Sequence, residues 1–239
     1  MMTRRNFMQK TALGVVATST VASWSRVLGA NDEIRVGVIG HRSKGEQHIH
    51  DFHKLAGVRV VAVCDADSEI MDKAEAAFKM NGETVRKYQD MRALLDQQDI
   101  DVVVIATPNH WHSLAAIWAI QAGKDVYVEK PVSHNISEGR ALVEAARKHD
   151  KIVQSGTQNR SDVGMRAFKN YLDEGHLGKV KWAHGLWFKR RESIGKVRGP
   201  QLIPASVDYN LWTGPAALQP LRRANLHYDW HWIWDTGNG

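Results

Sequence analysis

The sequence contains a single cysteine, Cys64, which excludes an internal disulfide framework and a zinc site built from several cysteines. No apolar stretch reaches the roughly 18 residues that a membrane-spanning helix needs, so no stable membrane anchor is expected. Acidic residues are missing from residues 1–30, where four basic residues carry +4 of the net charge of +6. The remaining chain is nearly neutral, which argues against a nucleic-acid partner. Hydrophobic residues (43%) and charged residues (24%) are present in ordinary amounts among the 239 residues, which excludes wholesale disorder, collagen and coiled coil.

Residues 1–30 have the pattern of an export signal peptide. The paired arginines Arg4 and Arg5 precede an uncharged stretch, 11–25, that is rich in small residues. The pattern resembles the twin-arginine signal, which is an address read by export machinery and not an anchor. A short amphipathic helix is the alternative, but the uncharged stretch has no polar face. Cleavage near Ala22 and cleavage near Ala30 both remain open. We expect twin-arginine export to the periplasm or another extracytoplasmic location.

Residues 33–64 have the pattern of a βαβ unit. An apolar, β-branched run over 33–40 predicts a buried parallel strand that ends at a glycine-containing turn. A helix is expected from the turn to Leu55, followed by a second strand over 58–64. Asp65 comes directly after this strand, twenty residues beyond Gly45. This is the spacing of a carboxylate that hydrogen-bonds the ribose hydroxyls of a dinucleotide, while the turn and the helix N-terminus receive its pyrophosphate.

The glycine turn departs from the Gly-x-Gly-x-x-Gly fingerprint at one position. Gly40 and Gly45 match it, but Arg42 stands where the second glycine is expected. Its Cβ could hinder close approach of the backbone to the phosphates, or its guanidinium could bind a phosphate as a fork. Asp65 favours NAD because a carboxylate repels a 2′-phosphate, whereas Arg42 leaves NADP open.

The alternation of strands and helices continues to residue 154. Strands are expected over 84–88, 101–106, 125–129 and 151–154, and helices over 68–80, 91–95, 109–122 and 136–149. Repeated strands and helices with short connections predict an α/β fold with a Rossmann-type, doubly wound parallel sheet over residues 31–155. Ligands of such folds bind at the carboxyl ends of the strands. Three polar segments are expected there, namely 107–112, 129–131 and 156–160.

These segments, taken in order, resemble the Gfo/Idh/MocA oxidoreductase family. The matching pieces are VGVIG at 36–40, AVCDAD at 62–67, ATPNHWH at 106–112, EKP at 129–131 and GTQNR at 156–160. The stretches LWTGP at 211–215 and HYDWHWIWDTGNG at 227–239 resemble exported members of the family. The likeness covers nearly everything after residue 30.

The resemblance implies roles for individual residues. Gly40 and Gly45 would lie under the pyrophosphate, and Asp65 would lie at the adenosine ribose. Lys130 would face substrate and nicotinamide together and relay the hydroxyl proton during hydride transfer. The remaining implied cofactor contacts are Arg42 at a phosphate, Thr107, Asn109 and His112 along the cofactor, Glu129 at the nicotinamide ribose and Gln158 at the nicotinamide end.

Residues 156–239 are expected to begin a second, α+β domain. A helix over 161–175 and an alternating strand over 179–190 would open the large antiparallel sheet that covers the active site in the family. We expect this domain to be incomplete, with the family's Asp or Asn and His partners of the lysine lying beyond residue 239, so that this polypeptide alone is a poor catalyst. Homo-oligomers through that sheet are expected only of the complete protein. Six tryptophans follow residue 180; most are expected in a core or an interface, with one or two as sugar contacts.

Three functions remain open from the sequence. The first is an exported NAD(P)-dependent oxidoreductase that acts on a sugar, polyol or related carbinol. The second is an NAD-dependent glycosidase that oxidises its sugar transiently, and the third is a non-catalytic nucleotide-binding fragment. No metal is expected, because His227 and His231 have helical spacing but lack the other ligands of a metal site.

Overall fold

The computed structural model describes residues 33–186 and 189–238, and its centre is one sheet of six parallel strands. The strand order is β3-β2-β1-β4-β5-β6. The strands are β1 (Ile34–Ile39), β2 (Val58–Cys64), β3 (Arg86–Tyr88), β4 (Val102–Ile105), β5 (Asp125–Glu129) and β6 (Val153–Gly156). This order reverses direction between β1 and β4, which is where Rossmann folds bind their ligands. The predicted doubly wound sheet is confirmed, whereas the predicted signal peptide lies outside the described residues.

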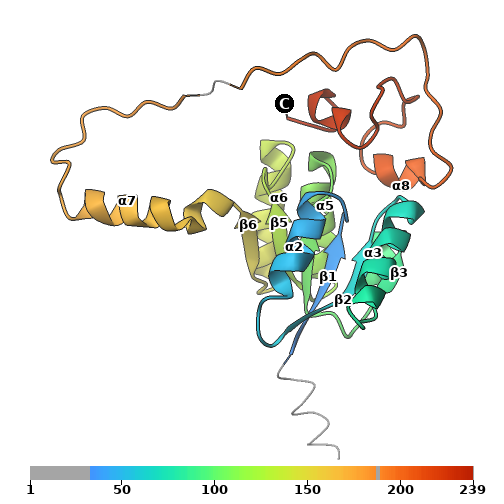
Figure 1. Ribbon diagram of the computed structural model, residues 1–239, viewed down its shortest axis with the longest axis horizontal. Helices are drawn as coiled ribbons and strands as arrows, with labels where there is room; N and C mark the ends of the chain where they lie inside the picture. Colours follow the sequence, from blue (N-terminus) through green and yellow to red (C-terminus); the bar gives the residue numbers. More distant parts are fainter. Residues whose placement is uncertain (1–32, 187–188, 239) are drawn as a thin grey trace, which may run out of the picture.

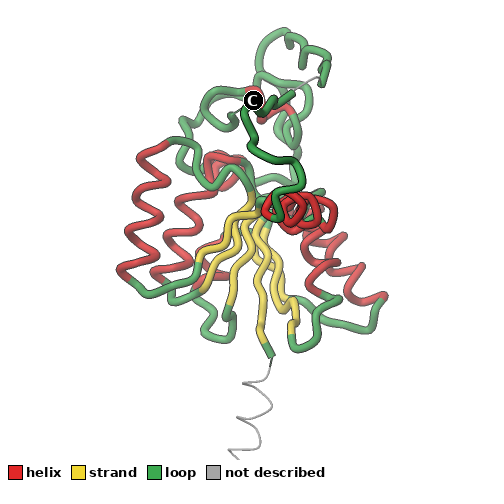
Figure 2. Tube along the Cα trace, turned by 90° about the vertical axis from the view of Figure 1, so that its left-hand side faces the viewer, coloured by secondary structure: helices red, strands yellow, loops and turns green. Residues whose placement is uncertain are grey.

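Helices cover both faces of the sheet (Figure 2). Residues of α2 and α3 pack with one set of strand valines, including Val36, Val38 and Val104. Residues of α4, α5 and α6 pack with the opposite set, including Ile39 and Val103. The helix bounds are α2 (Lys44–Phe52), α3 (Ser68–Met80), α4 (Met91–Leu95), α5 (Asn109–Gln121) and α6 (Ile136–Lys148). Side chains of the inner strands alternate between two buried faces, so β1, β2 and β4 are mostly apolar, whereas the edge strands β3 and β6 are more polar.

Short polar side chains set most of the helix starts. Asp67 accepts the backbone N–H of Glu69 at the start of α3, and Asn135 accepts that of Glu138 at the start of α6. Such caps satisfy backbone donors that the helix itself leaves free. Ser43, at the start of α2, makes no side-chain capping hydrogen bond. The first turn of α2, beside the glycine turn, therefore lacks a side-chain cap, and a bound anion can take the place of that cap.

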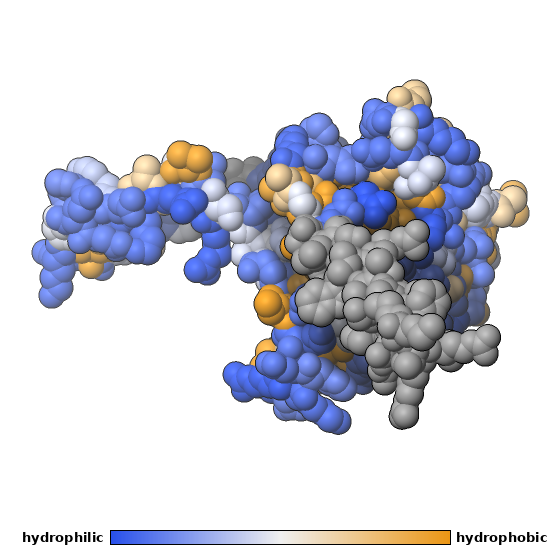
Figure 3. Space-filling view, turned by 90° about the horizontal axis from the view of Figure 1, so that it is seen from below, coloured by the Kyte–Doolittle hydropathy of each residue, from blue (hydrophilic) through white to orange (hydrophobic). Residues whose placement is uncertain are grey.

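The chain leaves the sheet after β6 through a short helical turn (Gln158–Ser161) and α7 (Val163–Asp173). Figure 1 shows α7 projecting from the side of the sheet, and Figure 3 shows apolar residues on that projecting arm. Val163, Met165 and Phe168 are exposed there by 81%, 53% and 52%. No residue of α7 is buried, and all of them except Leu172 are exposed.

The strand predicted over 179–190 is wrong for the described residues of that range, which have no regular secondary structure. Val180, Trp182 and Leu186 alternate as a strand would require, yet each is more than half exposed. A strand needs a neighbour that accepts and donates its backbone hydrogen bonds. No described segment pairs with this one, so the predicted antiparallel sheet does not form within the described residues.

Residues 200–238 return to the parallel sheet and lie over the carboxyl ends of its strands (Figure 1). This segment, called the return segment below, contains α8 (Tyr209–Thr213) and a helical turn (Asp229–Trp232). It has a small core of its own, built from Val207, Trp212, Leu221 and Leu226. An isolated antiparallel bridge joins its Val207 to Asp67. Every helix in the described part of the chain is too short or too polar to cross a membrane.

Candidate functional site

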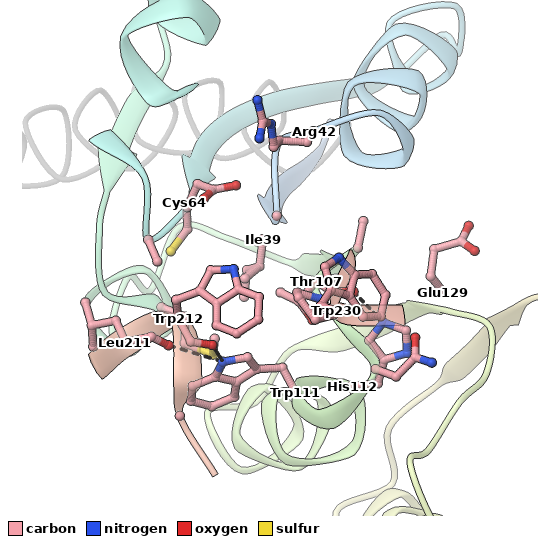
Figure 4. A pocket seen from close by; sticks show the side chains of 18 of the residues that line it. Ile39, Arg42, Cys64, Thr107, Trp111, His112, Glu129, Leu211, Trp212 and Trp230 are labelled. Atoms are coloured by element: carbon pink, nitrogen blue, oxygen red, sulfur yellow. Dashed lines mark hydrogen bonds between the residues drawn. The ribbon is translucent and has the colours of Figure 1, made fainter. Parts of the chain in front are cut away.

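A cavity of about 600 Å³ lies at the carboxyl ends of the strands, between the sheet domain and the return segment. Its walls come from the glycine turn, the ends of β2, β4 and β5, and the return segment. Figure 4 shows Glu129 and Cys64 at opposite sides of this cavity, with Ile39 and Thr107 between them. The volume is in the range of cofactor sites, which are usually 300–1,000 Å³.

The glycine turn brings its backbone close to its neighbours at two positions. Gly40 has φ +87°, and a Cβ there would lie 2.7 Å from the carbonyl carbon and oxygen of Ala106. At Gly45 a Cβ would overlap the carbonyl oxygen of Gly40. The first turn of α2 therefore rests directly on the turn that follows β1. Arg42 is exposed and lines the cavity between these two glycines.

Asp65 lies at the tip of β2, as its spacing predicted. One carboxylate oxygen accepts the backbone N–H of His41 at 2.9 Å, and the other accepts that of Asp67 at 3.0 Å. Burial raises the pKa of Asp65, and these two backbone donors oppose the rise. Each oxygen keeps a further acceptor direction for a hydroxyl group.

Glu129 and Lys130 lie at the end of β5, on the other side of the cavity. Glu129 is 5% exposed and lines the cavity with Lys130, whose side chain is exposed. Burial is the largest single influence and would raise the pKa of Glu129. The hydrogen bond and charge of His48, the backbone N–H of Lys130 and the charge of Lys44 together hold this pKa below its usual value. A buried carboxylate and an exposed ammonium are thus adjacent at this end of the site.

The loop after β4 and the first turn of α5 contribute three of the predicted residues, and all three line the cavity. The hydroxyl oxygen of Thr107 is buried and has no hydrogen-bond partner among the described residues. Asn109 donates to the side-chain oxygen of Asn238 at 2.9 Å. His112 is 1% exposed, and its ring nitrogens lie 2.6 Å from the carbonyl oxygen of Pro131 and 2.8 Å from that of Thr107. The segment that follows β4 and the segment that follows β5 are therefore joined through this imidazole.

Two predicted site residues do not line the cavity: Gly45 is buried against the backbone of Gly40, and Gln158 lies apart from the site. Gln158 begins the helical turn after β6 and is exposed. The strand predicted to end at 154 runs to Gly156 instead. The chain turns outward directly afterwards, which carries Gln158 away from the strand tips.

Several cavity residues were not singled out from the sequence. His227 pairs with Asp67 at 3.0 Å, and Trp230 and Asn238 line the same cavity. They belong to the stretch 227–239 whose likeness to exported family members was noted, but nothing in that stretch indicated which residues turn inward. His48 was not assigned a role from the sequence. In the described part of the chain, no three His, Cys, Asp or Glu side chains converge in a way that could hold a metal ion.

His110 gives this region a pH dependence that can be measured. Burial lowers the pKa of His110 to about 4, although its nitrogens face the carbonyl oxygens of Trp212 and Thr236. Below the unfolded pKa of about 6.5, the unfolded chain binds a proton that the folded chain refuses. The free energy of unfolding is therefore unaffected by the titration of His110 above pH 6.5. It falls by up to about 3 kcal/mol as the pH decreases towards 4.

Urea unfolding at pH 7.5 and 4.5 measures this loss. The replacement His110→Gln keeps a hydrogen-bond donor but cannot take up the proton, so its free energy of unfolding should fall less than that of the unmodified protein over the same interval. His50→Gln, at an exposed position of α2, should behave like the unmodified protein. If all three proteins lost the same free energy of unfolding between pH 7.5 and 4.5, His110 would not be the source of the pH dependence.

Comparisons with known proteins agree with this geometry. Residues 34–157, just over half of the chain, match the family GFO_IDH_MocA, described as an oxidoreductase family with an NAD-binding Rossmann fold. Inositol 2-dehydrogenase of Salmonella typhimurium (strain LT2) is 30% identical over 172 residues, which are 71% of this chain and 50% of that protein. Glycosyl hydrolase family 109 protein 2 of Shewanella sp. (strain ANA-3) is 39% identical over 120 residues, 48% of this chain and 26% of that protein. The chain thus spans half or less of the length of these relatives.

Solved structures give the same result. The myo-inositol 2-dehydrogenase of Lactobacillus plantarum superposes with a TM-score of 0.57 at 29% identity, over 62% of this chain and 43% of that one. The WlbA dehydrogenase of Bordetella pertussis, solved with NADH and UDP-GlcNAcA, superposes with a TM-score of 0.56 at 28% identity, over 61% and 43%. With the matched family covering β1 through β6, this chain belongs to the Gfo/Idh/MocA family of oxidoreductases with an NAD-binding Rossmann fold.

Proposed function

We propose that this protein binds NAD across the strand tips and transfers a hydride between the cofactor and a carbinol of a sugar or polyol. The observation that supports this most is that one cavity is lined by the glycine turn, Asp65, Thr107, Glu129 and Lys130. A dinucleotide needs backbone at its pyrophosphate, a carboxylate at its adenosine ribose and polar groups at its nicotinamide end. The inositol dehydrogenase relatives support a polyol or sugar as substrate.

The residues present fit such a cofactor. Gly40 and Gly45 leave no room for a Cβ, which keeps backbone atoms at the surface of the turn. The buried hydroxyl of Thr107, which has no partner among the described residues, faces the same cavity. Asp65 would accept the adenosine ribose hydroxyls, and its charge favours NAD over NADP. Arg42 would offer a guanidinium to the phosphates, and it leaves NADP as a weaker ligand.

The reaction needs a hydride acceptor and a path for a proton. NAD, when bound, supplies the hydride acceptor. Glu129 would hold the nicotinamide ribose and so fix which face of the ring meets the substrate. The Nζ of Lys130 would lie beside the reacting hydroxyl, stabilise the negative charge that develops on its oxygen, and relay its proton to solvent.

An NAD-dependent glycosidase is the second candidate. Its support is the 39% identity to a family 109 glycosyl hydrolase over 120 residues. The return segment covers the cavity, and such a cover would help to retain a cofactor that is reduced and reoxidised within one cycle. A non-catalytic nucleotide-binding protein is the third candidate, and it would use the same cavity without the lysine chemistry.

One set of measurements separates the three. The purified protein is denatured and any released nucleotide is identified, and the native protein is then titrated with NADH in a calorimeter. Absorbance at the NADH wavelength with inositols and hexoses tests net oxidation, and aryl-glycoside cleavage without added NAD tests hydrolysis. We expect binding together with polyol oxidation. Cleavage without added NAD would replace the first candidate by the second, binding without turnover would favour the third, and absence of binding would exclude all three.

We also propose that residues 1–30 direct export of the folded protein through the twin-arginine machinery to the periplasm. The paired arginines and the uncharged stretch after them support this proposal. Replacing Arg4 and Arg5 together by lysine should leave the protein in the cytoplasmic fraction, as seen by immunoblotting of cell fractions. Unchanged export of the doubly substituted protein would contradict it.

A further inference from the structure

His48 touches the cavity only through another residue. It lies on α2, and its Nε2 is 2.9 Å from Oε1 of Glu129 at the end of β5. The two side chains are 12% and 7% exposed, so solvent screens this contact weakly. Glu129 lines the cavity, whereas His48 does not. Any effect of His48 on a ligand must therefore pass through the carboxylate.

The carboxylate of Glu129 is held from two directions in a confined space. Its Oε1 takes the contact with His48, and its Oε2 accepts the backbone N–H of Lys130 at 3.2 Å. A Cβ at Gly156 would lie 3.0 Å from Oε1, so β6 leaves little room for the carboxylate of Glu129 to move. Each oxygen still has an acceptor direction open, which is what two vicinal ribose hydroxyls require.

The imidazole of His48 is itself oriented by packing. Its ring meets Tyr127 edge-on, with 5.0 Å between centroids and 69° between planes. Tyr127 and Glu129 are both on β5 and point to the same face of the strand, because side chains two residues apart share a face. His48 thus contacts two side chains on the same face of β5, packing against Tyr127 and pairing with the carboxylate of Glu129.

We propose that His48 is a positioning residue for Glu129, donating the hydrogen bond to Oε1 that sets the carboxylate for the nicotinamide ribose. The proposal rests on the NAD binding proposed above. One helix would then serve both halves of the cofactor. The first turn of α2 would contact the pyrophosphate, and His48, one turn later, would position the carboxylate that binds the nicotinamide ribose.

A merely structural role for His48 makes a different prediction. If the ring only packs α2 against the sheet, its removal should disturb the glycine turn and weaken every ligand that uses the turn. If it positions Glu129, its removal should weaken only ligands that carry the nicotinamide ribose. ADP carries the adenosine and the pyrophosphate alone, and NADH carries both halves.

The experiment compares NADH and ADP by calorimetry for three substitutions. For His48→Ala we expect NADH to bind about tenfold more weakly and ADP to bind within twofold of the unmodified protein. For His48→Gln, whose amide N–H can occupy the place of Nε2, we expect recovery of part of the NADH affinity. His53→Ala is the matched control, because His53 ends the same helix and pairs with Glu83 at 3.4 Å. We expect it to change neither affinity.

A second measurement needs no ligand. Carboxyl ¹³C NMR of the protein labelled in glutamate, assigned with Glu129→Gln, follows the titration of Glu129. Removing the hydrogen bond while the burial remains should raise the pKa of Glu129 in His48→Ala and not in His53→Ala. Equal losses of NADH and ADP affinity, or an unchanged titration of Glu129, would overturn the proposal. Failure of the unmodified protein to bind NADH would instead reject the proposed function, while the titration would still decide whether His48 controls the carboxylate.

Discussion

Replacing Gly45 by alanine is expected to weaken NADH binding by roughly 100-fold, close to 3 kcal/mol, and to destabilise the fold by about 3 kcal/mol. A Cβ at this position would overlap the carbonyl oxygen of Gly40, which is backbone and cannot rotate away. The first turn of α2 would have to lift from the glycine turn. The backbone N–H groups that should meet the pyrophosphate would move with it, since they belong to that turn. Calorimetry with NADH and urea unfolding measure the two effects.

The matched control is Gly82→Ala, just beyond α3. Gly82 also has positive φ, +73°, but a Cβ there would meet nothing within 4 Å. The substitution should cost about 1 kcal/mol of backbone strain and leave NADH affinity unchanged. If Gly45→Ala bound NADH as tightly as Gly82→Ala does, the placement of the pyrophosphate at this turn would be wrong.

Replacing Lys130 by alanine is expected to lower kcat by about 10²–10⁴-fold, the usual contribution of a positioned proton-transfer group. Lys130 lines the end of the cavity proposed for the nicotinamide, but the glycine turn and Asp65 lie at the other end and remain intact. NADH affinity should therefore change by less than about threefold. Steady-state kinetics on the substrate identified above, with NADH titration beside it, separates the two quantities.

Lys130→Arg is the informative companion. The guanidinium keeps the positive charge but does not release its proton near neutral pH. If the lysine relays a proton, the arginine variant should remain within about tenfold of the alanine variant in kcat. If it supplies charge alone, arginine should restore most of the activity. An alanine variant with nearly unchanged kcat would exclude Lys130 from the chemistry.

Much of the parallel sheet was predictable because its signals are local. The strand bounds over 58–64 and 125–129 and the helix bounds over 68–80 and 91–95 agree with the structure residue for residue. Each strand is a short apolar run beside a turn, and each of these two helices follows an aspartate that caps it. Asp65 was predictable in the same way, since its place depends on a strand end and a fixed spacing.

The strand predicted over 179–190 shows where local pattern stops being sufficient. The alternation of Val180, Trp182 and Leu186 is real, but a strand exists only when another segment pairs with it. Gln158 shows the same limit on a smaller scale. Its motif was recognisable, but the direction of the chain after β6 decided that it would lie outside the cavity.

Local sequence patterns were sufficient to predict a Rossmann sheet with a glycine turn, a carboxylate at the end of β2 and a lysine at the end of β5. Hydrophobic periodicity, turn residues and short spacings carry that information within a few residues of each site. The contact of His48 with Glu129, and the positions of His227 and Asn238 at the same cavity, follow instead from how distant segments pack together. Those partners lie 81 to 160 residues apart in the chain, and their meeting depends on how α2 and the return segment pack on the sheet.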